Sequence, residues 1–192
     1  MSSKSCALDP IPANLMKKCY DTLLPVITDI VNLSFNTAIV PTAFKETVVD
    51  PILKKNSLHH EVYENFRPIS NLSFISKATE KVVAVCLKHH LEDASLLYIC
   101  QSAYKKGHST ETELTRIHND ILRAINDGDF VILVLLDLSA AFDRVGHDIL
   151  ITWLKHRFGI TGKALGWIQS YLPGRTQFEE IGTERSSSRN LF

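Results

Sequence analysis

The sequence has few cysteines with which to form disulfide bonds or a zinc site. It contains four cysteines in 192 residues, at positions 6, 19, 86 and 100, and no two of them have a C-x-x-C spacing. Thiols scattered in this way are typical of a reducing compartment and argue against a disulfide framework. We therefore expect free thiols in a protein held together by its hydrophobic core.

Net charge and long apolar runs are also absent. The 21 basic and 21 acidic residues balance, so any attraction to nucleic acid must come from a local patch. No apolar run approaches the ~20 residues of a membrane span, and the N-terminal MSSKSCALDP lacks the apolar core of a signal peptide. We expect an intracellular protein, cytoplasmic or nuclear, with no membrane partner.

The composition that is present is that of an ordinary globular protein of the α+β class. Hydrophobic residues make up 45% of the chain and charged residues 22%, which suffices for a core. Apolar residues recur at helical spacing in some segments, and short β-branched runs lie between them. The predicted helices cover 9–38, with Pro25 as a kink or break, 71–97, 109–127, 147–160 and 163–172; the predicted strands cover 44–55, bent or broken at Pro51, and 131–136.

Two local patterns refine this assignment. Thr110 and Glu113 have the spacing of a capping box at the start of the helix in 109–127. Residues 57–70, SLHHEVYENFRPIS, have the polar, charged composition of a connecting loop.

The segment FVILVLLDLSAAFD, residues 130–143, carries the strongest chemical signal. Val131 to Leu136 form a continuous aliphatic run without helical periodicity, typical of a strand covered on both faces. The run ends in Asp137, and an ionised carboxylate is not left unpaired in an apolar interior. Two interpretations are open at this point: Asp137 caps the following turn, or it lies at the mouth of a site and binds Mg²⁺.

Six blocks in the same order resemble the reverse transcriptases of non-LTR (LINE-type) retrotransposons. LVLLDLSAAFDRVGHDIL is similar to motif A of that family, an apolar strand followed by D-L-S-x-A-F-D. NFRPIS resembles its N-[FY]-R-P-[IV]-S block, and QSAYKKGHSTETEL its Q-S-G-F-R-x-x-H-S-T-E-T-A-L block. GITGKALGWIQSYLPGRTQF resembles the segment after motif A. DPIPANLMKKC with LLPVITDIVNLSF resembles the segment that enters the fingers, and VPTAFKETVVDPILKK resembles the strand block that follows it. The resemblance implies an incomplete right-hand polymerase: helical fingers plus a partial palm with one buried strand.

The resemblance assigns roles around motif A. It implies that Asp137 is the catalytic carboxylate and that Asp137 and the backbone of Leu138 bind the catalytic Mg²⁺ ions. Two such ions about 3.5–4 Å apart clamp the attacking hydroxyl and the leaving group. Phe142 matches the steric gate that excludes the ribose 2′-hydroxyl from the nucleotide site. Asp143 is expected to cap the turn into the next helix.

The resemblance also assigns residues that bind nucleotide and template. Arg67 matches the arginine that grips the incoming triphosphate, for which a guanidinium fork is well shaped, and Lys54 is a weaker candidate for the same task. A template-contacting turn is implied at Gln101, Lys105, Lys106 and His108. The alternative for each charge is a solvated loop residue. In this turn Ala103 replaces the family's glycine, which would cost roughly 1 kcal/mol if that position needs a positive φ.

The second catalytic motif of the family is missing. No Asp-Asp pair occurs anywhere in the chain, whereas the resemblance calls for one on a hairpin after motif A. We expect a partial reverse transcriptase domain over 1–178 and a polar tail over 179–192, inactive as an isolated chain. The implied partners are an RNA template, a DNA primer and a chain that supplies the missing palm and thumb. The alternative is a fingers-derived module that binds RNA or protein without catalysis.

Overall fold

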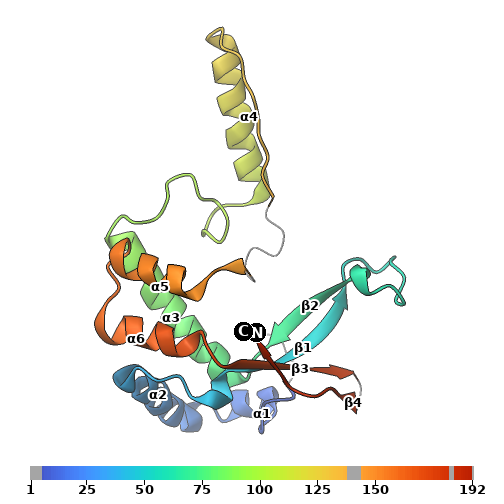
Figure 1. Ribbon diagram of the computed structural model, residues 1–192, viewed down its shortest axis with the longest axis vertical. Helices are drawn as coiled ribbons and strands as arrows, with labels where there is room; N and C mark the ends of the chain where they lie inside the picture. Colours follow the sequence, from blue (N-terminus) through green and yellow to red (C-terminus); the bar gives the residue numbers. More distant parts are fainter. Residues whose placement is uncertain (1–5, 138–143, 182–183, 192) are drawn as a thin grey trace. The chain divides into compact units, whose positions relative to one another are not determined.

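The computed structural model describes residues 6–137, 144–181 and 184–191 (Figure 1). It confirms an α+β chain in which helices accompany a mixed sheet. The chain divides into two compact units, Met1–Lys88 with Gly146–Phe192, and His89–Val145. The α-helices are α1 Ala13–Lys18, α2 Tyr20–Thr37, α3 Phe74–Asp93, α4 Thr110–Asn126, α5 His147–His156 and α6 Gly162–Tyr171, with 3₁₀ turns η1 Thr42–Phe44 and η2 Tyr63–Asn65.

The first unit is organised around a sheet of described strands in the order β2-β1-β3-β4, with β5 pairing β3 as well. β1 runs antiparallel to β2 and parallel to β3. Val48 and Val49 of β1 and Phe178 of β3 are buried, with Phe178 only 2% exposed. The strands are β1 Glu46–Leu53, β2 Phe66–Asn71, β3 Arg175–Ile181, β4 Glu184–Arg185 and β5 Arg189–Leu191.

Helices α2 and α6 pack together beside this sheet. Trp167 of α6 is buried, its ring meets Phe35 of α2 edge-on at 5.7 Å, and its Nε1 donates to Ser34 Oγ at 2.9 Å. Ser170 Oγ accepts the backbone N–H of Val40 at 2.9 Å. These contacts satisfy the polar atoms of the helix interface, so the two helices stay fixed against each other although 130 residues separate them.

The first helical segment divides at Cys19, not at the predicted Pro25. Pro25 lies within α2, the sixth residue of that helix. β1 likewise continues through Pro51, where it has β2 on one side and has already parted from β3. Pro51 faces Pro68 across the ladder, and because neither has an N–H, neither leaves a donor unpaired there.

The prediction that 57–70 is entirely loop is wrong in its last part. Phe66 to Ser70 belong to β2, paired in register with β1. The polar composition and Pro68 favoured a loop, but hydrogen bonding to a neighbouring strand overrode this local preference. Residues 179–191, polar in composition, likewise carry the end of β3 and all of β4 and β5.

The capping prediction for α4 is off by one residue. Ser109 is the N-cap: its Oγ accepts the N–H of Thr112 at 3.2 Å, and Thr112 Oγ1 accepts the N–H of Ser109 at 2.9 Å. Thr110 is already helical. Ser109, and not Thr110 as the Thr110–Glu113 spacing had indicated, is therefore the N-cap residue of α4.

The prediction of a buried strand at 131–136 is wrong in this structure. The segment has no regular secondary structure, and its side chains are between 40% exposed, at Val131, and 89% exposed, at Leu136. A strand covered on both faces needs neighbouring strands and helices to hold it. No strand of the described residues pairs with this run. Its composition favours extended backbone, but burial requires neighbours that it does not have.

Candidate functional site

The β1–β2 hairpin carries Arg67 and Lys54. Arg67 lies on β2 opposite Ile52 of β1, and Lys54 follows β1 directly, where its N–H donates to the carbonyl of Asn65 at 2.8 Å. Both side chains are exposed, and neither is tied by a hydrogen bond or ion pair to another described residue. The hairpin therefore presents two cations on its surface that are free to meet an anion.

The base of this hairpin is held by polar contacts from three segments. Asn71 Nδ2 donates to Asp50 Oδ2 at 2.6 Å across the β1–β2 pair. Asp9 Oδ1 accepts the N–H of Phe74 at 2.7 Å, where α3 begins. These charge-assisted contacts fix the strand ends, so the position of Arg67 on the hairpin is determined by well-connected backbone.

The second unit carries the turn Gln101–His108. Gln101 Nε2 donates to the carbonyl of Ala103 at 3.3 Å, and the N–H of His108 donates to the carbonyl of Lys105 at 3.3 Å. The positive φ of this turn falls on Tyr104, at 61°, and on Gly107, at 79°. Ala103 is not in the left-handed region, so the strain expected there lies one residue later, on an exposed tyrosine.

Side chains tie this turn to α4. Ser102 Oγ donates to Glu113 Oε2, and Arg116 donates to Cys100 Sγ at 3.4 Å. The turn therefore moves with the first two turns of α4. The side chains of Gln101, Lys106 and His108 are exposed on it, and that of Lys105 is half-buried.

Asp137 is exposed at the end of the apolar run. Within the described residues, no three His, Cys, Asp or Glu side chains lie close enough together to hold a metal ion. Leu138, Phe142 and Asp143 lie outside the described residues. One exposed carboxylate does not make a two-metal site, which needs several carboxylates converging on one point.

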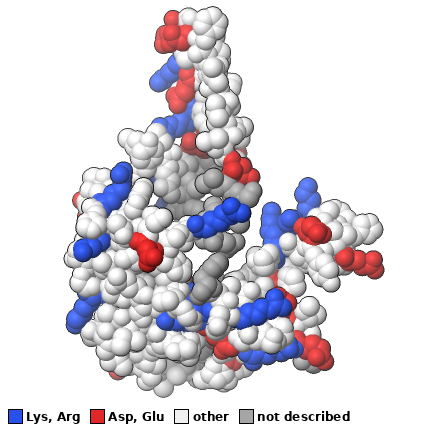
Figure 2. Space-filling model, viewed as in Figure 1, with Lys and Arg blue, Asp and Glu red and all other residues white. Residues whose placement is uncertain are grey.

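The surface charges are mixed. Figure 2 shows Lys and Arg side chains interspersed with Asp and Glu over the visible face, including the arm of the β1–β2 hairpin. This matches the neutral formal charge of the chain. Attraction to a polyanion would therefore depend on a few cations such as Arg67 and not on a broad basic face.

Comparison with known proteins decides the family. Residues 52–191 match the family described as "Reverse transcriptase (RNA-dependent DNA polymerase)". The chain belongs to the reverse transcriptase family. The resemblance to non-LTR retrotransposon reverse transcriptases predicted from the sequence blocks is thereby confirmed.

Three relatives from Drosophila melanogaster show the extent of the likeness. The chain is 35% identical over 124 residues, 65% of its length, to the probable RNA-directed DNA polymerase from transposon BS. It is 31% identical over 165 residues, 86% of its length, to the probable RNA-directed DNA polymerase from transposon X-element. Identity to the RNA-directed DNA polymerase from mobile element jockey is 26% over 171 residues, 89% of the chain. The matches cover only 14%, 18% and 18% of these relatives.

The reverse transcriptase motif residues fall in two places. Arg67 and Lys54 share the hairpin of the first unit, whereas Gln101, Lys105, Lys106 and His108 share the turn of the second. Asp137 also belongs to the second unit. Among the described helices of this reverse transcriptase chain, none combines the length and the hydropathy that crossing a bilayer demands.

Sequence reasoning missed a cluster at the end of α6. Tyr171 donates its hydroxyl hydrogen to Glu80 Oε1 of α3, and Arg175 Nη2 lies 3.8 Å from the same oxygen. The Arg175 guanidinium stands 4.5 Å from the centre of the Tyr171 ring, and Trp167 stacks on that ring at 5.3 Å. The signal was present as W-x-x-x-Y-x-x-x-R, which places two aromatic rings one helical turn apart, but the glutamate partner is some 90 residues earlier.

The surroundings of Tyr171 in this cluster raise the pKa of its hydroxyl. Burial, followed by the hydrogen bond to Glu80 and its negative charge, raises the pKa of the Tyr171 hydroxyl to about 12. The hydroxyl thus stays protonated and continues to donate to Glu80 throughout the physiological range. The cluster joins α3, α6 and the start of β3. These contacts help to hold β3 beside β1, its parallel neighbour in the sheet.

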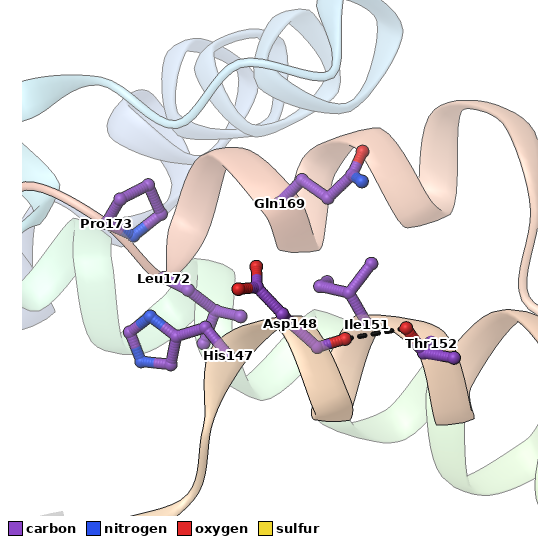
Figure 3. Close-up of a pocket in the computed structure, with 7 residues that line it drawn as sticks. All are labelled: His147, Asp148, Ile151, Thr152, Gln169, Leu172 and Pro173. Atoms are coloured by element: carbon purple, nitrogen blue, oxygen red, sulfur yellow. Dashed lines mark hydrogen bonds between the residues drawn. The ribbon is translucent and has the colours of Figure 1, made fainter.

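A shallow cavity of about 450 Å³ lies between α5 and α6 (Figure 3). Asp148 and Thr152 line it from α5, Gln169 from α6, and Pro173 from the turn that follows. Thr152 Oγ1 donates to the backbone carbonyl of Asp148 at 2.8 Å, and in Figure 3 the Asp148 carboxylate points toward α6. The cavity has a single carboxylate in its lining and none of the residues expected to bind metal, nucleotide or template.

Proposed function

We propose that this chain supplies the fingers and the first part of the palm of an RNA-directed DNA polymerase of a non-LTR retrotransposon. The observation that carries the proposal is the family match over residues 52–191. It is supported by the hairpin and the turn, which hold the motif cations on exposed, well-anchored backbone. In this proposal residues 1–178 form the partial domain and 179–192 are a polar segment, of which β4 and β5 pair with β3.

The motif residues then take the following roles. Arg67, helped by Lys54, meets the triphosphate of the incoming nucleotide, because a guanidinium fork can bind two phosphate oxygens at once. Phe142 excludes the ribose 2′-hydroxyl. The template strand of RNA is contacted by the turn that bears Gln101, Lys105, Lys106 and His108.

The described residues do not form a complete site for the catalytic metal ions. Asp137 contributes one carboxylate, and the described residues gather no group of three potential ligands. Mg²⁺, with Asp137 and the Leu138 carbonyl as ligands, therefore belongs to a polymerase completed by further carboxylates. We infer that the isolated chain does not extend primers, and that a chain supplying the rest of the palm and the thumb is its partner.

Primer extension on an RNA template tests this function. The purified chain alone should give no template-directed product, and addition of a palm–thumb fragment of a related enzyme should restore extension. Asp137→Ala should abolish the restored activity, whereas Asp129→Ala, which removes the carboxylate at the other end of the same apolar run, should leave most of it. Extension by the chain alone that Asp137→Ala abolishes would show that the isolated chain is active.

A second function, RNA binding without catalysis, is favoured by one observation. Arg67 and Lys54 are exposed and have no described partner, so an anion could reach them without breaking existing contacts. RNA retention without restored extension in the completed mixture would support this reading over the first.

A further inference from the structure

The stretch 149–178, which contains most of α5 and all of α6, has no acidic residue. Asp148 and Glu179 bound it, and its basic residues are Lys155, Arg157, Lys163 and Arg175. Because the chain has 21 residues of each sign, 17 basic and 21 acidic residues remain elsewhere. A local excess of cations in a neutral chain is the electrostatic signature of a site for a polyanion.

One face of α5 combines this charge with exposed apolar surface. Ile149, Trp153 and Arg157 follow one another at four-residue spacing, so they lie along the same side of the helix and its end. Ile149 is 65% exposed and Trp153 54% exposed, and Lys155, His156 and Arg157 are exposed as well. Tryptophan rings are highly buried on average, so a ring that is more than half exposed is not accounted for by the packing of the described residues.

The cation and the ring on this face are neighbours. Arg157 Cζ stands 5.7 Å from the centre of the Trp153 ring, within the roughly 6 Å over which a guanidinium is attracted to an aromatic face. More than half of the tryptophan surface is still open to solvent. The pair therefore offers a flat aromatic surface with a positive charge beside it.

The end of α5 holds this pair on fixed backbone. The carbonyl of Trp153 accepts the N–H of Arg157 at 2.9 Å. Gly159 then has a φ of 68°, in the left-handed region, and the N–H of Ile160 returns to the carbonyl of Leu154 at 2.9 Å. Ile160 is buried, which ties the helix end to the core. A ligand would therefore meet a preformed surface and little backbone would have to be ordered on binding.

The carboxylate of Asp148 does not oppose the positive charge of this face. Asp148 precedes Trp153 by five residues, which places it about 140° away around a helix that turns roughly 100° per residue. Its side chain lines the cavity between α5 and α6 and points toward α6 (Figure 3). An anion that approaches Trp153 therefore approaches the cations of α5 and not its acid.

We propose that the face of α5 formed by Ile149, Trp153, Lys155 and Arg157 binds single-stranded nucleic acid. One base stacks on the Trp153 ring, and Lys155 and Arg157 hold the adjacent phosphates. An acidic peptide would satisfy the charge but has no ring system to cover the indole, and a duplex keeps its bases stacked on one another. The proposal goes beyond the polymerase function and does not depend on it, because it uses none of the residues expected to bind metal, nucleotide or template.

Tryptophan fluorescence reports this face directly. The chain has two tryptophans, and Trp167 is buried and shielded from an added oligonucleotide. Titration with a uridine oligonucleotide or a thymidine oligodeoxynucleotide should therefore quench the emission of Trp153, and the two probes separate RNA from DNA. Inorganic tripolyphosphate carries charge without bases and should not quench. Trp153→Leu should abolish the quenching, whereas Trp153→Phe should keep most of the affinity for the oligonucleotide.

Fluorescence anisotropy of the labelled oligonucleotides measures that affinity. It is best done in an Arg67→Ala, Lys105→Ala background, so that failure of the polymerase proposal does not affect the result. There Trp153→Leu should weaken binding at least about fivefold, the lower end of what stacking of one base contributes. Lys155→Gln with Arg157→Gln should lower the slope of log affinity against log salt by roughly 1.4, for two phosphate contacts on a single strand.

α1 supplies the matched control. Lys17 and Lys18 form a basic pair in its last turn, and Lys17→Gln with Lys18→Gln should leave both the quenching and the salt slope unchanged. Circular dichroism should show the same helix content in every variant, because the substituted side chains are exposed. The proposal is overturned by absence of quenching with both oligonucleotides, by equal quenching with tripolyphosphate, by Trp153→Leu binding as tightly as its parent, or by an equal effect of the α1 pair.

Discussion

At the scale of single residues, the half-buried Tyr171 shows how one hydroxyl group can hold three elements together. Its hydrogen bond to Glu80 links α6 to α3, and Arg175 reaches the same carboxylate from β3. Tyr171→Phe keeps the stacked ring and removes only the donor. We expect a loss of about 1.5–3 kcal/mol in the free energy of unfolding, typical of a hydrogen bond to a charged group, measured by urea denaturation at neutral pH.

The raised pKa of Tyr171 adds a pH signature to this prediction. Because the folded pKa, about 12, exceeds the ordinary value of 10.0, the folded chain holds this proton more tightly than the unfolded chain. The contribution is therefore complete below pH 10 and is lost as pH rises from 10 toward 12. Tyr171→Phe should make the alkaline decline in stability shallower, whereas Tyr63→Phe, at a residue 90% exposed, should leave it unchanged. An equal effect of both substitutions would contradict the assignment.

At the scale of elements, the start of α4 offers a discriminating pair of substitutions. Ser109 caps the helix through its Oγ, while Thr110 is the first helical residue. Ser109→Ala should lower the stability of the helix by about 1 kcal/mol, because it leaves the N–H of Thr112 without its side-chain acceptor. Thr110→Ala should have little effect. Amide hydrogen exchange in the first turn of α4 measures both, and a larger loss of protection in Thr110→Ala would place the cap where the sequence spacing had put it.

At the scale of the whole molecule, acidic and basic residues balance, so the net charge does not attract RNA. Any RNA binding must therefore come from a few individual cations. If Arg67 and Lys105 contact phosphates, binding should be weak, indifferent to sequence and lost as salt rises. Each contact removed should lower the slope of log affinity against log salt by about one, so Arg67→Ala with Lys105→Ala should flatten it measurably. Filter binding over a salt series gives this slope, with Lys17→Ala on α1 as the control.

The direction of the salt effect identifies the kind of contact, because RNA binding through phosphates weakens as the salt concentration rises. No RNA retention at low salt, or a slope that the double substitution leaves untouched, would argue that these cations are solvated surface charges. In that case the chain would not itself bind the RNA template.

The sequence by itself determined the family, because motif blocks such as NFRPIS and DLSAAFD are contiguous and do not depend on what surrounds them. It also determined the helices that became α3 to α6, since apolar periodicity and nearby termination signals are local. Only the tertiary structure decided the rest. β2 formed where composition favoured a loop because β1 pairs with it, and the Leu136 side chain stayed exposed because no described strand covers its segment. Glu80 met Tyr171 across 91 residues, a contact that depends on how helices pack and that no local pattern records.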